Sequence, residues 1–265
     1  MKNAILSFFS NDSVFGRLMT KIGIIIGANM MFVLFSIPVV TIGASYAGLY
    51  QVMLKTLRGN GVVNPFKQFW IGFKTNFRQA TIVWVIAAVL AVVGYFNIKI
   101  CAQAEGFIHY LQYGVYALGV IMAVILIYFF PTMTAFENTI VNLIKFGLYF
   151  AFHKPWLILV NLFFHVFPLY LIYTDEHFRP LYAFIWFFFG FGAITMLTSR
   201  LLIKDFSKYL PLVDDCGDFI LTDDGEKIMP GSPEEKAYYA SGDGAEGMAD
   251  KSEKEILEEM KKLDM

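Results

Sequence analysis

The chain has 265 residues, of which 57% are hydrophobic, 17% aromatic and only 16% charged, and its net charge is −1. Soluble domains carry about 25% charged residues, so this composition excludes a disordered chain and most soluble enzymes and favours a membrane protein. Residues 1–208 hold 15 Lys and Arg against 6 Asp and Glu, whereas residues 209–265 hold 6 against 16. We therefore predict a membrane helix bundle over residues 1–208 and an acidic, largely disordered cytoplasmic tail over residues 209–265.

Five apolar runs are long enough, or nearly so, to cross about 30 Å of hydrocarbon as helices. They cover residues 22–42, 80–98, 113–131, 156–173 and 181–203. Residues 43–57 would form a helix only about 22 Å long at about 1.5 Å per residue, which predicts either a short crossing or a re-entrant half. The predicted fold class is an all-α, polytopic membrane helix bundle with five long spans, a short or re-entrant second helix and interfacial amphipathic helices.

The distribution of Lys and Arg predicts the topology, because these residues concentrate on cytoplasmic loops. If residues 43–57 cross the membrane or re-enter it, 13 of the 15 cations of residues 1–208 lie on one side. Five spans alone leave 5 of the 15 inside with a cytoplasmic N-terminus and 10 inside with the reverse orientation. We therefore expect a multi-pass protein of the cell membrane with both termini cytoplasmic, and with residues 102–112 and the loop around Asp175 on the opposite side.

A helix start is predicted at Asn64, whose side chain can cap a helix, followed by Pro65 at the first helical position. Five aromatic residues then share one helical face: Phe66, Phe69, Trp70, Phe73 and Phe77. A basic amphipathic helix of this kind suits the cytoplasmic membrane surface, where it serves either as an anchor or as a docking surface for a partner. The candidate docking residues are Lys67, Trp70, Lys74 and Arg78.

Two proline motifs indicate a weak internal repeat. Pro38-x-x-Thr41 ends the first apolar run and Pro131-x-x-Thr134 ends the third. Inverted repeats are common in transporters, but with one proline motif in each half chance similarity is the preferred interpretation. We also expect Pro131 to break the third span.

Polar residues near the later spans are candidates for intramembrane chemistry, since ionisable groups in membranes are costly and often functional. Glu137, Asn142 and Lys145 fall at helical spacings, either within the membrane or solvated at its surface. Asn161 and His165 lie four residues apart in the fourth run and can face one neighbouring helix. This pair predicts either a proton or substrate relay or a plain interhelical hydrogen bond of about 0.6 kcal/mol.

The sequence contains no motif for a catalytic centre or a cofactor. Asp175, Glu176 and His177 are adjacent, and a solvated turn is preferred over a metal site because neighbouring side chains do not readily point at one ion. In the tail, Ser252 with Glu255 indicates a capped terminal helix. We expect a protein that is not an enzyme, with no metal site, no cofactor and no nucleic-acid partner.

Four short motifs carry a family resemblance. They read Phe9-Ser-Asn-Asp-Ser-Val-Phe-Gly-Arg, Ser36-Ile-Pro-Val-Val-Thr-Ile-Gly-Ala-Ser, Leu49-Tyr-Gln-Val-Met-Leu-Lys and Asn76-Phe-Arg-Gln-Ala-Thr. Together they resemble the YesL-like family of bacterial membrane proteins, which is defined by domain of unknown function 624, over roughly residues 8–208. Positions that match the family pattern include Pro38, Thr41, Gly43, Tyr50, Lys55, Asn76 and Phe77. The resemblance implies a bacterial cell membrane but no established activity, and the frequent location of family genes near carbohydrate uptake systems implies a role beside a sugar transporter.

Two classes of function follow from these observations. The preferred hypothesis is a non-enzymatic accessory or regulatory membrane protein associated with carbohydrate uptake or utilisation. Its partners are then the lipid bilayer and either a sugar transporter or a signalling membrane protein. The rival is a small secondary transporter, which the proline motifs and the weak repeat favour.

Overall fold

The computed structural model describes residues 14–59, 63–214, 218–222 and 224–240. The chain divides into two compact units, the first made of Met1–Leu57 and Val62–Ile203 and the second of Arg58–Gly61 and Lys204–Met265. Regular structure in the described residues is helical apart from two isolated β-bridges, which confirms the predicted all-α class. The predicted terminal helix at Ser252 and Glu255 lies outside the described residues.

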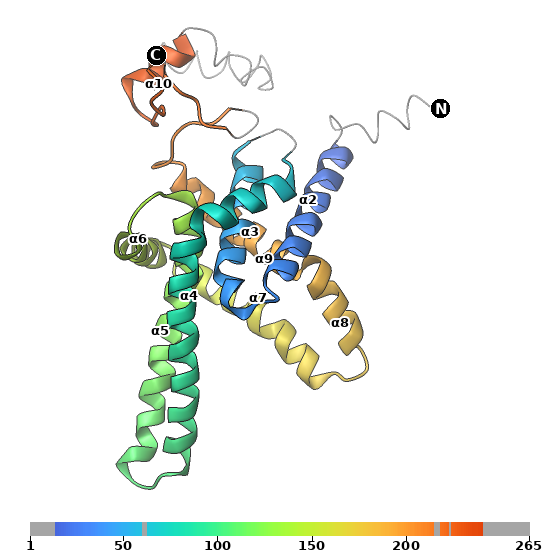
Figure 1. Cartoon of the computed structure of the whole chain (residues 1–265), viewed down its shortest axis with the longest axis vertical. Coiled ribbons are helices and arrows are strands. Elements are labelled where there is room, and N and C mark those ends of the chain that lie inside the picture. The colour runs from blue at the N-terminus through green and yellow to red at the C-terminus, as the bar shows by residue number, and fades with distance from the viewer. Residues whose placement is uncertain (1–13, 60–62, 215–217, 223, 241–265) are drawn as a thin grey trace, which may run out of the picture. The chain divides into compact units, whose positions relative to one another are not determined.

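The helices of the first unit follow one another closely along the chain (Figure 1). They are α2 (Val14–Phe35), the short 3₁₀ helix η1 (Val39–Thr41), α3 (Ile42–Arg58), α4 (Pro65–Gln103), α5 (Phe107–Ala135), α6 (Ile140–His153), α7 (Trp156–Thr174), α8 (Arg179–Ile185), the π-helical η2 (Trp186–Gly190) and α9 (Phe191–Phe206). Four segments are long and apolar enough to cross a membrane: α2, α4, α5 and the continuous run from α8 to α9. A fifth is added if α6 and the first part of α7, which meet at a bend of 101°, count as one broken span.

Helix α4 joins two elements that the sequence analysis kept apart. Residues 66–78 were expected to form a separate surface helix before a span at residues 80–98, but one helix of 39 residues contains both. The reason is local, because no glycine or proline separates Phe77 from Thr81 and the helix has no cause to end there. The predicted start is confirmed, since the Asn64 side chain accepts the backbone N–H of Lys67 at 3.1 Å. Figure 1 shows the first turns of α4 running across the bundle before the helix turns along α5.

The expected break at Pro131 is wrong, because Pro131 lies inside α5 and the helix continues to Ala135. Proline removes one backbone donor, and neighbouring hydroxyl groups can stabilise the backbone around it. The Thr132 hydroxyl donates to the Tyr128 carbonyl oxygen at 2.8 Å, and the Thr134 hydroxyl donates to that of Phe130 at 2.7 Å. Threonines of the proline motif therefore accompany a continuous helix.

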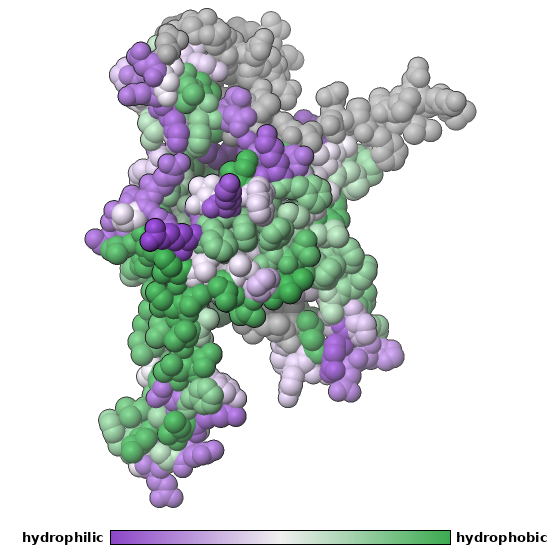
Figure 2. All heavy atoms as spheres, viewed as in Figure 1, coloured by the Kyte–Doolittle hydropathy of each residue, from purple (hydrophilic) through white to green (hydrophobic). Residues whose placement is uncertain are grey.

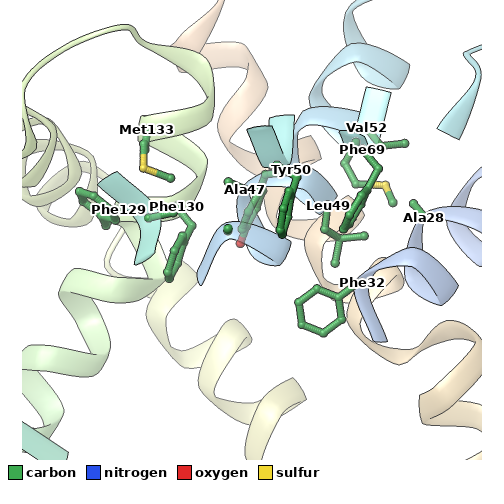
Figure 3. Packing of buried hydrophobic residues seen from close by; sticks show 14 of the residues in the cluster. Ala28, Phe32, Ala47, Leu49, Tyr50, Val52, Phe69, Phe129, Phe130 and Met133 are labelled. Atoms are coloured by element: carbon green, nitrogen blue, oxygen red, sulfur yellow. The ribbon is translucent and has the colours of Figure 1, made fainter. Parts of the chain in front are cut away.

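Helix α3 lies at the centre of the first unit, and most of its side chains are buried (Figure 3). Glycines let it approach α4 closely. A Cβ atom at Gly43 would lie 2.6 Å from the Ala80 carbonyl oxygen, and one at Gly48 would lie 2.9 Å from the carbonyl oxygen of Phe69. Small residues at helix contacts are typical of membrane proteins, because close backbone approach maximises van der Waals packing.

Two helical hairpins differ in length within this unit. The short hairpin consists of α2, the turn at residues 36–41, and α3. The long hairpin consists of α4 from residue 80 onward, the turn at residues 104–106, and α5. The long hairpin exposes large apolar side chains along most of its length, including Ile86, Val89, Leu90, Val93, Phe96, Leu118 and Ile121. Figure 2 shows this apolar surface ending in polar residues at the hairpin tip. Such a surface is suited to lipid, which identifies a membrane-embedded protein in contact with the bilayer.

The described part of the second unit contains more order than its composition predicted. Isolated β-bridges pair Val213 with Phe219 and Leu221 with Lys227, and helix α10 covers Pro233–Ala240. Arg58 donates to the Pro211 carbonyl oxygen and lies over the Phe219 ring, with its Cζ 5.6 Å from the centroid. Burial lowers the pKa of the Arg58 guanidinium. These contacts organise the first residues of a segment that was expected to be largely disordered.

Candidate functional site

The turn of the short hairpin is built by hydrogen bonds to its own carbonyl groups. The Thr41 hydroxyl lies 2.6 Å from the Phe35 carbonyl oxygen and 2.8 Å from that of Pro38, which also accepts the Thr41 backbone N–H at 2.9 Å. From α4, the Trp84 indole N–H donates to the Val39 carbonyl oxygen at 2.7 Å. Pro38 and Thr41, which the family pattern singles out, therefore have a clear structural role at this turn.

Beside this turn, α3, α4, α5 and α7 line a pocket of about 230 Å³. Aromatic side chains from three of these helices form much of its lining: Tyr46, Tyr50, Trp84 and Phe130. The Tyr46 and Phe130 rings stack with centroids 5.5 Å apart. Among the described residues that line the pocket, none carries a charge. This composition is suited to an uncharged, largely apolar ligand.

One end of the pocket is polar, and it contains a predicted residue. Asn161 is buried on α7, and its side-chain amide oxygen Oδ1 accepts the Thr198 hydroxyl of α9 at 2.7 Å. The Asn161 amide nitrogen donates to the Leu157 carbonyl oxygen at 3.1 Å. Thr198 also interacts with Tyr50 through a side-chain hydrogen bond. Asn161 thus makes an interhelical hydrogen bond, which is one of the two interpretations drawn from the sequence. The side chain of His165 lies outside the described structure.

A second buried polar centre holds the π-helical segment η2 against α2. The Asn29 side chain donates to the Phe187 carbonyl oxygen at 2.5 Å and to that of Trp186 at 3.4 Å, and it accepts the Gly192 backbone N–H at 2.7 Å. A π-helical segment disturbs the regular ladder of backbone hydrogen bonds, so a polar side chain from a neighbouring helix can compensate it. A Cβ atom at Gly192 would lie 2.9 Å from the Ile25 side chain, so this glycine allows the close contact.

The remaining family positions do not join this site. Lys55 is half-buried near the end of α3. The Asn76 amide donates to the Gly72 carbonyl oxygen at 3.0 Å within α4, and the Phe77 ring packs against Phe73 with centroids 5.4 Å apart. Of the family positions, Pro38 and Thr41 lie in the turn before α3, and Gly43, Tyr50 and Lys55 lie in α3 itself. Only Tyr50 lines the pocket.

The helical spacing assigned to Glu137 and Lys145 is wrong, because Glu137 lies in the connection between α5 and α6. Asn138 lies in the same connection, and its side-chain oxygen accepts the Thr139 backbone N–H at 2.8 Å and the Asn142 amide at 2.8 Å. Glu137, Asn142 and Lys145 are all exposed in the structure. They do not form a common buried face.

The basic residues of α4 form an exposed face instead. Lys67, Trp70, Lys74 and Arg78 are all exposed, and their spacings of three, four and four residues put them along one side of the helix. The Trp70 ring packs on Phe73 with centroids 5.8 Å apart and on Phe35 with centroids 5.7 Å apart. The indole is therefore held by Phe35 of the short hairpin and Phe73 of α4, while 49% of the Trp70 surface stays exposed. We call these four residues the basic face.

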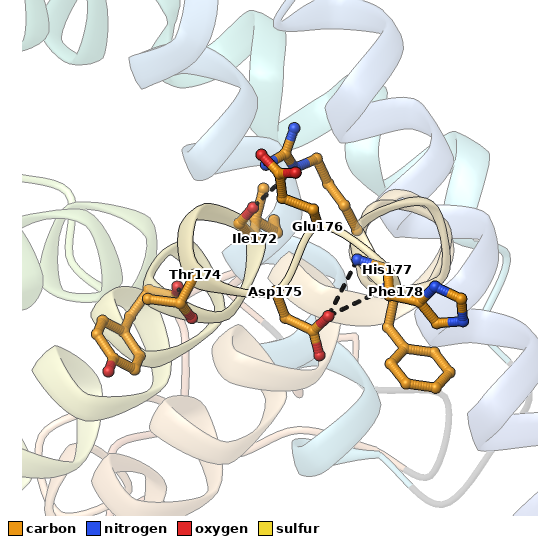
Figure 4. A network of polar contacts seen from close by, with 8 residues as sticks. Ile172, Thr174, Asp175, Glu176, His177 and Phe178 are labelled. Atoms are coloured by element: carbon orange, nitrogen blue, oxygen red, sulfur yellow. Dashed lines mark hydrogen bonds and ion pairs between the residues drawn. The ribbon is translucent and has the colours of Figure 1, made fainter.

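The turn between α7 and α8 is stabilised by its own acidic residues (Figure 4). One carboxylate oxygen of Asp175 accepts the backbone N–H groups of His177 at 3.1 Å and Phe178 at 3.2 Å. Glu176 pairs with Arg179 at 3.4 Å. Within the described ranges, no group of three or more His, Cys, Asp or Glu could hold a metal ion. The interactions of Asp175 agree with the interpretation of this sequence as a turn.

Neither the pocket nor the Asn29 centre is predicted by the sequence. Asn29 stood out only as a polar residue inside an apolar run, and nothing local marked the Trp84 indole as a partner of the short hairpin. Both sites join residues far apart in the chain: Asn29 with Phe187, and Trp84 with Val39. Local periodicity does not report such pairings.

The apolar spans and the lipid-facing hairpin define an α-helical, multi-pass membrane protein. A family model described as "Protein of unknown function, DUF624" matches residues 25–98, which confirms the family resemblance drawn from the sequence motifs. The match covers most of the short hairpin and most of α4. The chain is also 25% identical over 108 residues to "Uncharacterized protein YteU" of Bacillus subtilis (strain 168). That alignment covers 41% of this chain and 49% of YteU, so the chain spans about half the length of this curated relative. No solved structure matches the chain.

Proposed function

We propose that the protein is a non-enzymatic accessory or regulatory component of a membrane assembly in the bacterial cell membrane, and that the basic face of α4 is its docking surface. The observation that carries this proposal is the exposure of three cations and a tryptophan along one side of a helix, with the tryptophan ring held by Phe35 and Phe73. The association with carbohydrate uptake or utilisation is supported by the family resemblance.

The chemistry of the basic face favours an acidic partner surface. Residues 13–104 contain no Asp or Glu, so the cations of this face have no acidic neighbour nearby in the sequence. Arginine and tryptophan are enriched at the energetic centres of protein interfaces, and Trp70 is already held in place by Phe73 and Phe35. A pre-ordered side chain loses less entropy on binding than a mobile one.

The test uses a photoreactive amino acid in place of Trp70 in living cells. We expect it to cross-link to a membrane component of a sugar uptake or signalling system. Replacing Lys67, Lys74 and Arg78 together by Glu should lower the cross-linked yield at least about tenfold, since an acidic surface would now be repelled. Lys99→Glu, on the far part of α4, is the control and should leave the yield unchanged. An equal yield from the triple variant and the control would refute the docking surface.

The orientation that we propose places the basic face in the cytoplasm. Of the 15 Lys and Arg of residues 1–208, 13 then lie on the cytoplasmic side. They include Lys67, Lys74 and Arg78 of the basic face and Lys55 and Arg58 at the end of α3. The tip of the long hairpin and the turn at Asp175 lie on the opposite side of the membrane from the cytoplasm. Both termini are cytoplasmic in this arrangement.

Within that arrangement, α3 is a re-entrant helix and the turn of the short hairpin lies in the hydrocarbon. Trp84, which bonds the Val39 carbonyl oxygen, lies six residues after Arg78 and fifteen before Lys99. These separations along α4 correspond to about 9 Å and about 22 Å at about 1.5 Å per residue. The turn therefore stops about 22 Å short of the level of Lys99, and Figure 1 shows it well short of the tip of the long hairpin.

The composition of the turn supports this depth. Ile37 is 73% exposed and Val39 is 64% exposed, which suits lipid and not water. In hydrocarbon, irregular backbone must find partners within the protein, and the carbonyl groups of Phe35, Pro38 and Val39 do so. Among the side chains of this turn, the buried Ser36 hydroxyl has no hydrogen-bond partner in the described structure.

A small secondary transporter is the second candidate function, favoured by the pocket between four helices beside a re-entrant turn. Transporters often bind substrates near the bilayer midplane, next to discontinuous helices. The two functions are separated by reconstituting the purified protein into proteoliposomes and measuring uptake of radiolabelled sugars. Flux well above that of protein-free vesicles, abolished by Asn161→Leu, would favour the transporter over the accessory role.

A further inference from the structure

The pocket between α3, α4, α5 and α7 lies at the level of the re-entrant turn, because Trp84 belongs to both. Its indole N–H is bonded to the Val39 carbonyl oxygen while its side chain lines the pocket. Apolar residues of the turn are exposed at this level, namely Ile37, Val39 and Val40. If the turn lies in hydrocarbon, molecules that reach the pocket come from the bilayer and not from water.

The lining of the pocket excludes a charged ligand. Aromatic and aliphatic side chains from four helices surround it, including Tyr46, Trp84, Ala123, Phe130 and Leu162. Burying an ion without a partner in such a site costs several kcal/mol. The polar side-chain atoms of Asn161 already have protein partners, namely the Thr198 hydroxyl and the Leu157 carbonyl oxygen. The Trp84 indole N–H is likewise bonded to the Val39 carbonyl oxygen.

The size of the pocket favours part of a molecule over a whole one. Its volume of about 230 Å³ is below the range of about 300–1,000 Å³ that is usual for small-molecule sites. An apolar cavity of this kind excludes water and accepts hydrocarbon. A slender aliphatic chain meets all three conditions: it is uncharged, it is abundant at this depth, and it can enter while its head group stays at the membrane surface.

We propose that this pocket binds an acyl chain of a membrane phospholipid. The chain inserts among Tyr46, Trp84 and Phe130 and approaches Tyr50 on the buried helix α3. This inference rests on the proposed placement of the turn in the membrane but not on the docking role of the basic face. It gives the short hairpin a ligand that can stabilise the packing of α3 against α4, α5 and α7.

The proposal is tested with phosphatidylglycerol that carries a diazirine in one acyl chain. The purified full-length protein is reconstituted into vesicles of this lipid, irradiated, and digested for mass spectrometry. Tyr50 is only 4% exposed, so bulk lipid does not reach it. We therefore expect labelling at Tyr46 and Tyr50 in addition to labelling of lipid-facing residues such as Val89 and Leu118.

Pocket-filling substitutions provide the decisive comparison. Ala123→Phe should lower labelling of Tyr46 and Tyr50 at least about fivefold while labelling of Val89 is retained. Ala117→Phe is the matched control, since Ala117 is exposed on the same helix, and it should leave both signals unchanged. Leu162→Trp fills the pocket from α7 and replaces Ala123→Phe if that variant does not fold. Retained labelling at Val89 in each sample shows that the protein is inserted.

Three results would overturn the proposal. Tyr46 and Tyr50 could stay unlabelled while Val89 and Leu118 are labelled. The pocket-filling variants could label Tyr50 as strongly as the wild type does. A diazirine-bearing free fatty acid could label Tyr50 where the phospholipid does not, which would reject a phospholipid as the source of the chain. None of these results depends on the cross-linking experiment at Trp70, so failure of one proposal is distinguishable from failure of the other.

Discussion

The two hairpins of the membrane unit end in turns of different kinds. The short hairpin turns at Ile37, Val39 and Val40, with its carbonyl groups bonded to Thr41 and Trp84. The long hairpin turns at residues 104–106, among exposed polar residues such as Gln103 and Glu105. A turn in water can leave its backbone to the solvent, whereas a turn in lipid needs partners from the protein.

The hairpins also differ in what covers their helices. Helix α3 of the short hairpin is enclosed by protein and depends on glycines at its contacts, while the far part of the long hairpin is largely exposed and has open space around Gly114 and Gly119. Length and hydropathy mark α2, α4 and α5 as possible spans but do not report this difference in packing. Only the short hairpin requires shape complementarity, and substitutions should therefore have unequal effects in the two regions.

The largest effect is expected from Gly43→Leu in the short hairpin. A Cβ atom at Gly43 would lie 2.6 Å from both the Ala80 carbonyl oxygen and the Trp84 Cβ, so a leucine there must separate α3 from α4. Overpacking of this kind costs about 1–3 kcal/mol or more, and we expect loss of the monodisperse peak in detergent or a clearly lower thermal midpoint. Gly119→Leu, with no atom within 4 Å, should change stability by less than about 0.5 kcal/mol. Equal loss in both variants would remove the distinction between the hairpins.

A smaller effect is expected from Asn29→Leu. The substitution leaves the carbonyl groups of Trp186 and Phe187 and the N–H of Gly192 without their side-chain partner. Interhelical hydrogen bonds in membranes average about 0.6 kcal/mol, so losing three of them should lower stability by about 2 kcal/mol. The matched control is Asn97→Leu on the long hairpin, where the amide donates only to the Val93 carbonyl oxygen of its own helix. Unfolding in mixed micelles measures both variants, and a milder effect for Asn29 than for Asn97 would contradict the role of Asn29.

The smallest effect concerns the polar end of the pocket. Asn161→Leu and Thr198→Val each remove one partner of a hydrogen bond between α7 and α9. A double-mutant cycle should give a coupling free energy of about 0.6 kcal/mol, the average for such pairs in membranes. A coupling indistinguishable from zero would mean that the two side chains do not interact in the folded protein.

Local signals in the sequence predicted the helices better than the contacts between them. The capped start at Asn64 and four of the five apolar spans are confirmed, because capping and hydropathy are properties of neighbouring residues. The run at residues 156–173 contributes a span only if α6 and the first part of α7 count as one broken span. The continuity of α5 past Pro131 was not predicted, since it depends on how neighbouring hydroxyl groups compensate the proline. The continuity of α4 past Arg78 was missed for a different reason, because the local sequence contains no glycine or proline that would end the helix there. One local signal was overlooked: Ser232 and Glu235 bracket the start of α10, where the Glu235 backbone N–H lies 3.3 Å from the Ser232 hydroxyl.

The candidate site was only partly predictable. Tyr50 and Asn161 were identified in advance, one from the family pattern and one as a polar residue in an apolar run. Their connection through Thr198 was not, because it joins three helices that are distant in the chain. Trp84 was missed for the same reason: its partner Val39 is 45 residues away.

The re-entrant placement of the short hairpin is tested most directly by cysteine accessibility in intact cells. Cys101 and Cys216 are replaced by Ser, and single cysteines are introduced in place of Val39 and Gly106. A membrane-impermeant maleimide should label the cysteine at position 106, at the tip of the long hairpin, and should not label the one at position 39, either in intact cells or after the inner face is opened. Labelling at position 39 from the outside, equal to that at position 106, would show that α3 crosses the membrane and would contradict the account.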